Sequence, residues 1–166
     1  MTIYELNANF KQGLSLIYAA SYGSLQHGVK KLLEKGLIKF RETVQNGRNK
    51  KIYQIKDSGR KVFFDWMVAE LPLNNLETII LSKIYFLGLI EDKNTIIFMI
   101  EEMIKKTESV ENNLKMLDSE LSELSLPEES LKIAKYQFKT LDYGIMAHSS
   151  AIQWLKELLQ EIKNET

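Results

Sequence analysis

The stretch "YGSLQHGVKKLLEKGLIKFRETVQNGRNKKIYQI", residues 22–55, decides the fold of the first half of this chain. Its first part repeats apolar residues at helical spacing, namely Leu25, Val29, Leu32 and Leu33. Ser21 is a suitable cap before this helix, and Gly36 is a residue type that ends one. Apolar and polar residues then alternate at 38–41 and 53–56 around "QNGRN". The stretch therefore predicts a helix followed by two short strands joined by a turn at residues 45–49.

The same region concentrates positive charge. Residues 24–64 contain eleven lysines and arginines and three acidic residues, hence a net charge of +8, in a chain whose formal net charge is zero. The balancing acid lies beyond residue 64. A compact basic segment is the electrostatic footprint of a protein that meets a polyanion. The alternative is a solvated basic surface, and charge alone does not separate the two.

The flanking sequence completes a small domain. "TIYE", residues 2–5, has the spacing of a capping box and predicts a helix that ends near residues 11–13. Residues 14–20 are expected to form a connector anchored by Leu16, Ile17 and Tyr18, and a further helix is expected from about Asp57 to Glu70. Helix, helix with a polar and basic face, then basic hairpin is the order of a winged helix-turn-helix. In that module the second helix enters the major groove, which is about 12 Å wide, and the hairpin lies against phosphates.

"YGSLQHGVKKLLEKGLI" and "NGRNKKIYQIKDSGRK" resemble the recognition helix and wing of the PadR family of bacterial transcriptional regulators, and "TIYEL" is similar to that family's T-G-Y-E-L. The resemblance covers residues 2 to about 66 and implies DNA binding. Gln26 and His27 stand where the family usually has Tyr-Pro, so the base-facing surface differs, and Asn49 replaces a proline of the wing. Family members carry one further helix before T-G-Y-E-L, so we expect an upstream start or another helix covering that face.

The acidic half has a helical pattern. Residues 74–77 have capping-box spacing before a helix that Gly88 should stop, and apolar residues at alternating steps of four and three follow from 96 to 124 and from 131 to 162. These are coiled-coil seams. We expect an antiparallel helical pair exchanged with a second subunit, in preference to a hairpin within one chain and no dimer. The resemblance also implies homodimers joined through such helices.

The expected fold class is therefore mainly α with a small β-hairpin. A winged helix-turn-helix DNA-binding domain is expected at residues 1–71, and a long-helix antiparallel coiled-coil dimerisation domain, with effector binding left open, at residues 72–166.

Enzymatic chemistry finds little support in this sequence. There is no cysteine, and the two histidines, His27 and His148, have no metal-ligand or triad partner nearby in sequence. No glycine-rich phosphate loop appears. We expect no enzymatic activity, cofactor or metal, and His148 should be a satisfied polar residue in a helical interface. No apolar run reaches the roughly 18 residues of a membrane span, and no signal peptide is evident, so we expect a cytoplasmic protein without membrane contact.

Aromatic residues gather near small residues on the last helix. Tyr136, Tyr143 and Trp154 have Gly144, Ala147 and Ala151 as neighbours in sequence. Two interpretations are open, an effector pocket at a dimer interface for a small aromatic ligand and ordinary packing, and packing is the favoured one.

Together these features predict a sequence-specific DNA-binding transcriptional regulator, a repressor that binds an inverted-repeat operator in double-stranded DNA as a homodimer. The competing hypothesis is a coiled-coil adaptor whose basic domain docks an acidic protein. The residues expected to contact DNA are Tyr22, Ser24, Gln26 and His27 near base edges, Lys30 and Lys31 beside them, and Arg48, Lys50 and Lys51 on phosphates or in the minor groove.

Overall fold

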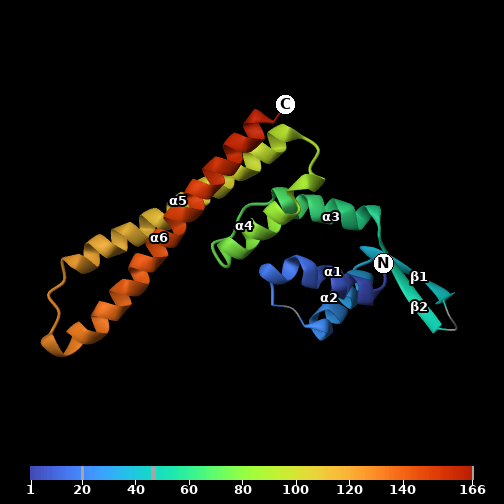
Figure 1. The fold of residues 1–166 in the computed structure, drawn as a ribbon, viewed down its shortest axis with the longest axis horizontal. Coiled ribbons are helices and arrows are strands. Elements are labelled where there is room, and N and C mark those ends of the chain that lie inside the picture. The colour runs from blue at the N-terminus through green and yellow to red at the C-terminus, as the bar shows by residue number, and fades with distance from the viewer. Residues whose placement is uncertain (20, 46–47, 166) are drawn as a thin grey trace. The chain divides into compact units, whose positions relative to one another are not determined.

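The computed structural model describes residues 1–19, 21–45 and 48–165. The described part is mostly helical with one two-stranded antiparallel sheet, which confirms the predicted fold class (Figure 1). The chain divides into two compact units, residues 1–86 and 87–166, called here the N-terminal unit and the helical unit. Residues 72–86 therefore group with the N-terminal unit, whereas the sequence pattern placed them in the second domain. The division of labour between residues 1–71 and 72–166 stays a prediction.

The N-terminal unit begins with α1 (Ile3–Gln12). The Glu5 amide donates to Thr2 Oγ1 at 3.2 Å, and the Thr2 amide donates to Glu5 Oε2 at 2.8 Å, so the predicted capping box is confirmed. A 3₁₀ turn, η1 (Leu14–Leu16), follows. Leu16 is 90 % exposed, so the expectation that it anchors the connector is wrong. A three-residue turn can pack only one of its sides against the protein, and Leu16 lies on the other side. Tyr18 makes the contact with the rest of the unit, because its hydroxyl lies 2.9 Å from Ser82 Oγ.

Helix α2 (Tyr22–Glu34) starts and ends as predicted. The Ser24 amide donates to Ser21 Oγ at 3.1 Å, and Gly36 adopts the left-handed φ of 67° that lets the chain turn away. Strands β1 (Ile38–Gln45) and β2 (Arg48–Ile55) then pair in a register that runs from Ile38 opposite Ile55 to Gln45 opposite Arg48. The strands are longer than expected, so the turn is shorter than residues 45–49. Residues 46 and 47 lie outside the described part of the chain.

Helices α3 (Asp57–Val68) and α4 (Leu76–Tyr85) complete the N-terminal unit. The expected capping box at residues 74–77, with Asn74 as the cap, is wrong: the N-cap of α4 is Asn75, which has left-handed dihedrals, φ 57° and ψ 35°, and makes no side-chain cap bond. A capping side chain reaches the first amides only from an extended backbone. In α4, Lys83 is 3 % exposed and its Nζ donates to the Ala69 carbonyl at 2.6 Å. Burial lowers the pKa of this amine.

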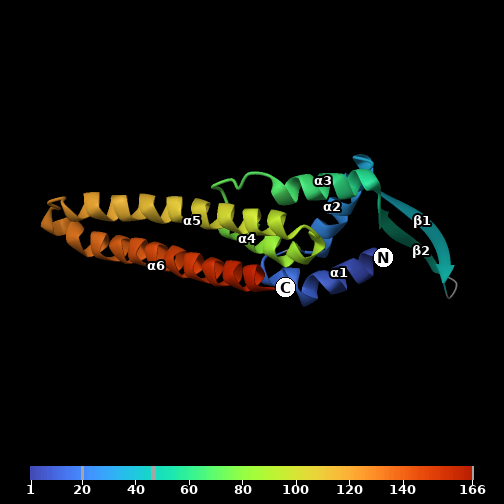
Figure 2. The same cartoon turned by 90° about the horizontal axis from the view of Figure 1, so that it is seen from above.

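The helical unit starts with the 3₁₀ turn η2 (Leu87–Leu89), which holds Gly88 beyond the end of α4. Two long helices follow, α5 (Lys93–Ser122) and α6 (Glu128–Asn164), and they lie side by side as an antiparallel hairpin (Figures 1 and 2). The register is tied by Lys163–Glu101 and Lys156–Glu108 ion pairs of 2.9 and 2.7 Å. The expected antiparallel pair thus forms within a single chain, and its exchange with a second subunit stays a prediction.

Candidate nucleic-acid interface

The predicted recognition helix α2 presents a broad exposed face. Val29 is buried, and the six α2 residues that the sequence assigns to DNA are all exposed, namely Tyr22, Ser24, Gln26, His27, Lys30 and Lys31. The helix therefore brings these six side chains together on its solvent side. A helix with one buried edge and a polar, cationic outer face has the shape and charge to lie in a major groove.

Two of these side chains have intramolecular contacts. Ser24 Oγ donates to the Ser21 carbonyl at 2.7 Å, so its hydroxyl proton is engaged in the first turn of the helix. Lys30 Nζ lies 3.8 Å from Glu34 Oε1, and both side chains are well exposed. Exposed pairs of this kind contribute only about 0–1 kcal/mol, so a phosphate can compete for Lys30 at little cost.

The wing formed by β1 and β2 separates its cations. Successive side chains of a strand point to opposite faces, so Lys50 and Lys51 do not share a face. Lys50 is paired with Thr43 and Lys51 with Glu42. The side chain of Arg48, the third predicted wing contact, lies outside the described part of the structure. Lys50 and Lys51 therefore lie on opposite faces of the wing, and the predicted contacts of Arg48, Lys50 and Lys51 with phosphates or the minor groove stay a prediction.

The register reveals two cations that sequence reasoning missed. Lys39, Arg41 and Thr43 occupy every second position of β1, so their side chains lie on one face of the wing. Thr43 is paired with Lys50, so Lys50 lies on that same face. Both are exposed. The signal was present in the sequence, because Lys39 and Arg41 alternate with Ile38 and Phe40, but their face relative to β2 depends on the register.

The outer edge of β2 is covered by the start of the chain. The Tyr53 amide donates to the Met1 carbonyl at 2.8 Å, and the Met1 ammonium donates to the Tyr53 carbonyl at 3.1 Å. These bonds satisfy part of a strand edge and tie the wing to the residues before α1. In the first turn of α1, the hydrogen bond from the Thr2 amide lowers the pKa of the Glu5 carboxyl. The positive charge of Lys50 lowers the same pKa by a smaller amount.

The predicted effector residues lie on the surface of α6. Tyr136, Tyr143 and Trp154 are 64 %, 66 % and 45 % exposed, and their spacing of seven and eleven residues puts them on one face of the helix. None of them lines the two cavities described in the helical unit. One cavity, of about 540 Å³, is an apolar groove between the ends of α5 and α6 nearest their connection, where Leu117 and Leu121 are among the lining residues.

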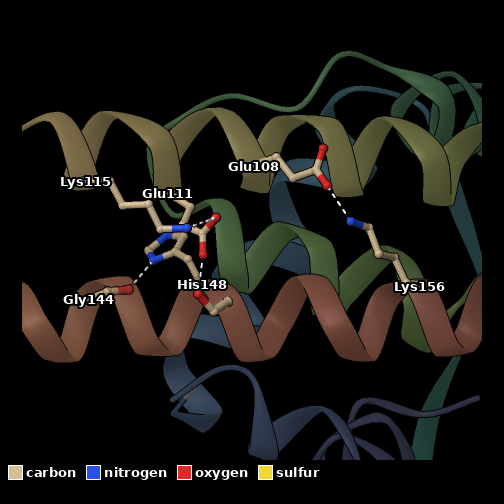
Figure 3. A network of polar contacts seen from close by, with 7 residues as sticks. Glu108, Glu111, Lys115, Gly144, His148 and Lys156 are labelled. Carbon is tan, nitrogen blue, oxygen red and sulfur yellow. Dashed lines mark hydrogen bonds and ion pairs between the residues drawn. The ribbon is translucent and has the colours of Figure 1, made fainter.

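Polar residues interrupt the seam between α5 and α6 (Figure 3). Glu111 is only 8 % exposed, accepts a hydrogen bond from Ser149 Oγ, and forms an ion pair with Lys115 at 3.0 Å. The Ser149 hydroxyl, followed by Lys115, holds the pKa of Glu111 below its ordinary value. His148 Nδ1 lies 2.7 Å from the Gly144 carbonyl, as expected of a satisfied interface histidine. Within the described residues, no group of three or more His, Cys, Asp or Glu is placed to hold a metal ion.

The helical unit carries the decisive match to a known family. Residues 79–163, about half of the 166 residues, match the family described as "Virulence activator alpha C-term". The chain belongs to this family. The virulence activator alpha match covers the part of the chain where sequence reasoning found only a helical pattern, because seams of leucine and isoleucine recur in many unrelated proteins.

A second comparison spans almost the whole length. The negative transcriptional regulator PadR of Bacillus subtilis (strain 168) is 22 % identical over 167 residues, which is 98 % of this chain and 90 % of that protein. The PadR resemblance that the sequence indicates is thereby confirmed. A crystal structure of Bacillus subtilis PadR in complex with operator DNA is 20 % identical, covers 98 % of this chain and 91 % of that one, and has a TM-score of 0.41. The same protein in complex with p-coumaric acid is 20 % identical, with coverages of 99 % and 91 % and a TM-score of 0.44.

None of the described helices combines the length and the apolar character that crossing a bilayer requires.

Proposed function

We propose that this protein is a sequence-specific DNA-binding transcriptional regulator, a repressor that acts in the cytoplasm on an inverted-repeat operator. The observation that carries the proposal is the exposed polar and cationic face of α2, followed directly by a basic wing, in a segment of net charge +8. The PadR relative is a negative transcriptional regulator by name, which supports repression and gives no support to an enzymatic role.

Roles follow from the chemistry of the exposed side chains. Gln26 carries an amide that can bond adenine N6 and N7 together, and Tyr22 and His27 flank it as further base contacts. Ser24 reaches the same groove from the first turn while its hydroxyl proton stays on the Ser21 carbonyl. Lys30 and Lys31 are assigned to phosphates, as are Arg48 and Lys50 of the wing. Phosphate contacts set the position of the helix, and base contacts set its sequence preference.

The operator symmetry requires two copies, and the helical unit offers apolar surface for them. Leu117, Leu124 and Ile133, which line or border the apolar groove of α5 and α6, are each more than two-fifths exposed. The side of α6 that carries Tyr136, Tyr143 and Trp154 is exposed as well. Contiguous exposed apolar surface of this kind marks an interaction site. We propose that a second copy covers it, and that a small aromatic effector binding beside Tyr136, Tyr143 and Trp154 releases the operator.

A mobility-shift experiment tests the function. The full chain is titrated against the DNA upstream of its own gene and against random duplex of equal length. A regulator shifts the upstream DNA at lower concentration than random duplex and shifts both at low salt. An adaptor that docks an acidic protein shifts neither, or binds both equally and only through weak, screened attraction. Absence of any shift at micromolar protein and low salt contradicts the proposal.

A further inference from the structure

We infer that the wing meets the DNA backbone through the face that carries Lys39 and Arg41, and that Lys51 on the opposite face contributes little. The inference rests on the proposed DNA-binding function and specifies which side of the hairpin faces the nucleic acid. It adds two phosphate-binding residues, Lys39 and Arg41, that the resemblance to known regulators does not name.

The pairing register defines the two faces. Residues directly opposite in an antiparallel ladder point to the same side, and alternate residues along a strand point to opposite sides. One face, the cationic face, holds Lys39, Arg41, Thr43, Lys50, Ile52 and Gln54. The other, the aromatic face, holds Ile38, Phe40, Glu42, Val44, Asn49, Lys51, Tyr53 and Ile55. Among the described side chains of the two strands, the cationic face carries Lys39, Arg41 and Lys50 and no carboxylate, and the Glu5 carboxyl of α1 interacts with Lys50. The aromatic face carries one cation and one carboxylate.

Lys51 is already engaged on the aromatic face. Its Nζ lies 3.8 Å from Glu42 Oε1 and 4.4 Å from the centre of the Phe40 ring, which in turn stands 6.0 Å from the Tyr53 ring. A phosphate that approached Lys51 would also approach the Glu42 carboxylate, and the repulsion would offset the attraction. The Lys51–Glu42 ion pair alone is as weak as the pair of Lys30 with Glu34, but Lys51 also lies over the Phe40 ring, so a phosphate would have to draw it away from two contacts on its own face.

Lys39 and Arg41 are placed differently. Across the ladder Lys39 faces Gln54 and Arg41 faces Ile52, so neither has a carboxylate opposite it. Two residues along a strand rise about 6.8 Å, which lets adjacent cations reach successive phosphates of one DNA strand. Arg41 adds a planar guanidinium that can hold two phosphate oxygens at once. The spacing, the charge and the absence of a carboxylate opposite Lys39 or Arg41 all favour phosphate binding by these two residues.

Salt dependence of binding to the upstream DNA separates the two faces. Each neutralised phosphate contributes about −0.9 to the slope of log K against log salt, so Arg41→Gln should reduce the slope by about 1.8 when both wings of a dimer are engaged. The double change Lys39→Gln with Arg41→Gln should reduce it by about 3.6. Lys51→Gln, which removes the same charge from the other face of the same strand pair, should change the slope by less than about 0.5. Arg41→Lys should keep the slope and lose affinity at one fixed salt concentration.

The outcomes are distinct. All four side-chain changes are on exposed residues, and circular dichroism of each variant checks that the hairpin and helices persist. A Lys51→Gln slope that falls as far as that of Arg41→Gln, or a wild-type slope in the double variant, overturns the face assignment while leaving DNA binding intact. A wild-type protein that binds no duplex overturns the proposed function and the inference together.

Discussion

Gly59→Ala should destabilise the N-terminal unit although alanine is the better helix former. Gly59 lies in the first turn of α3, and a Cβ there would lie 2.2 Å from the Leu37 carbonyl oxygen and 2.9 Å from Ile55 Cγ1. The oxygen is backbone and already accepts a hydrogen bond of 3.0 Å from the Lys56 amide, so it cannot swing aside. The start of α3 must move by roughly 1 Å, as in other overpacked sites.

The cost combines three contributions. Overpacking costs about 1–3 kcal/mol, and weakening the bond to Leu37 costs a further ~0.5–1.5 kcal/mol. The helix gain of alanine over glycine returns about 1 kcal/mol. We therefore expect a net loss of about 1–3 kcal/mol in the free energy of unfolding. Gly28→Ala is the matched control, because Gly28 lies inside α2 and a Cβ there meets nothing within 4 Å. That variant should gain about 0.5–1 kcal/mol.

Urea unfolding followed by tryptophan fluorescence measures both changes. The chain has two tryptophans, and a Trp154→Phe background leaves Trp66 as the reporter of the N-terminal unit, where its ring lies 5.9 Å from that of Phe63. The midpoint should fall for Gly59→Ala and rise for Gly28→Ala at equal m-value. If Gly59→Ala keeps the wild-type midpoint, the close approach of α3 to the Leu37 carbonyl is refuted.

Three further changes test other parts of the molecule. Gln26→Ala should relax base preference at one operator position by about 1–3 kcal/mol and leave random-duplex affinity nearly unchanged, as competition binding with operator variants would show. Leu117→Asp with Leu121→Asp puts carboxylates into the apolar groove, and sedimentation should then show a monomer with a folded N-terminal unit; a wild type that is already monomeric contradicts the dimer. The pKa of Glu111 is lowered from 4.5 in the folded chain, so its contribution is complete above pH 4.5 and is lost as the pH falls through the lowered value. In Glu111→Gln, the melting temperature of the helical unit should therefore fall less steeply than in the wild type as the pH is lowered. If the variant and the wild type show the same dependence of melting temperature on pH, Glu111 does not stabilise the folded unit.

Features governed by neighbouring residues were predictable from the sequence. The capping box of Thr2 and Glu5 joins groups three residues apart, and the end of α2 at Gly36 needs only a residue that tolerates positive φ. The spacing of apolar residues in α2, and the alternation of apolar and polar residues in the strands, indicate that one side of each element packs against the protein. The exposed face of α2 and the β1–β2 hairpin followed from these local patterns, because each depends on residues close together in the sequence.

Features governed by distant residues required the tertiary structure. Which side of the wing carries Lys39 and Arg41 depends on the register, and a shift by one residue would move every side chain to the other face. The capping box expected from Asn74 to Glu77 does not form, because the N-cap of α4 is Asn75 and its backbone is left-handed. Glu111 meets Ser149 across 38 residues of sequence, and only the pairing of α5 with α6 brings them together. Local spacing determines what an element can be, whereas the partner of each buried or paired group depends on how the elements fold onto one another.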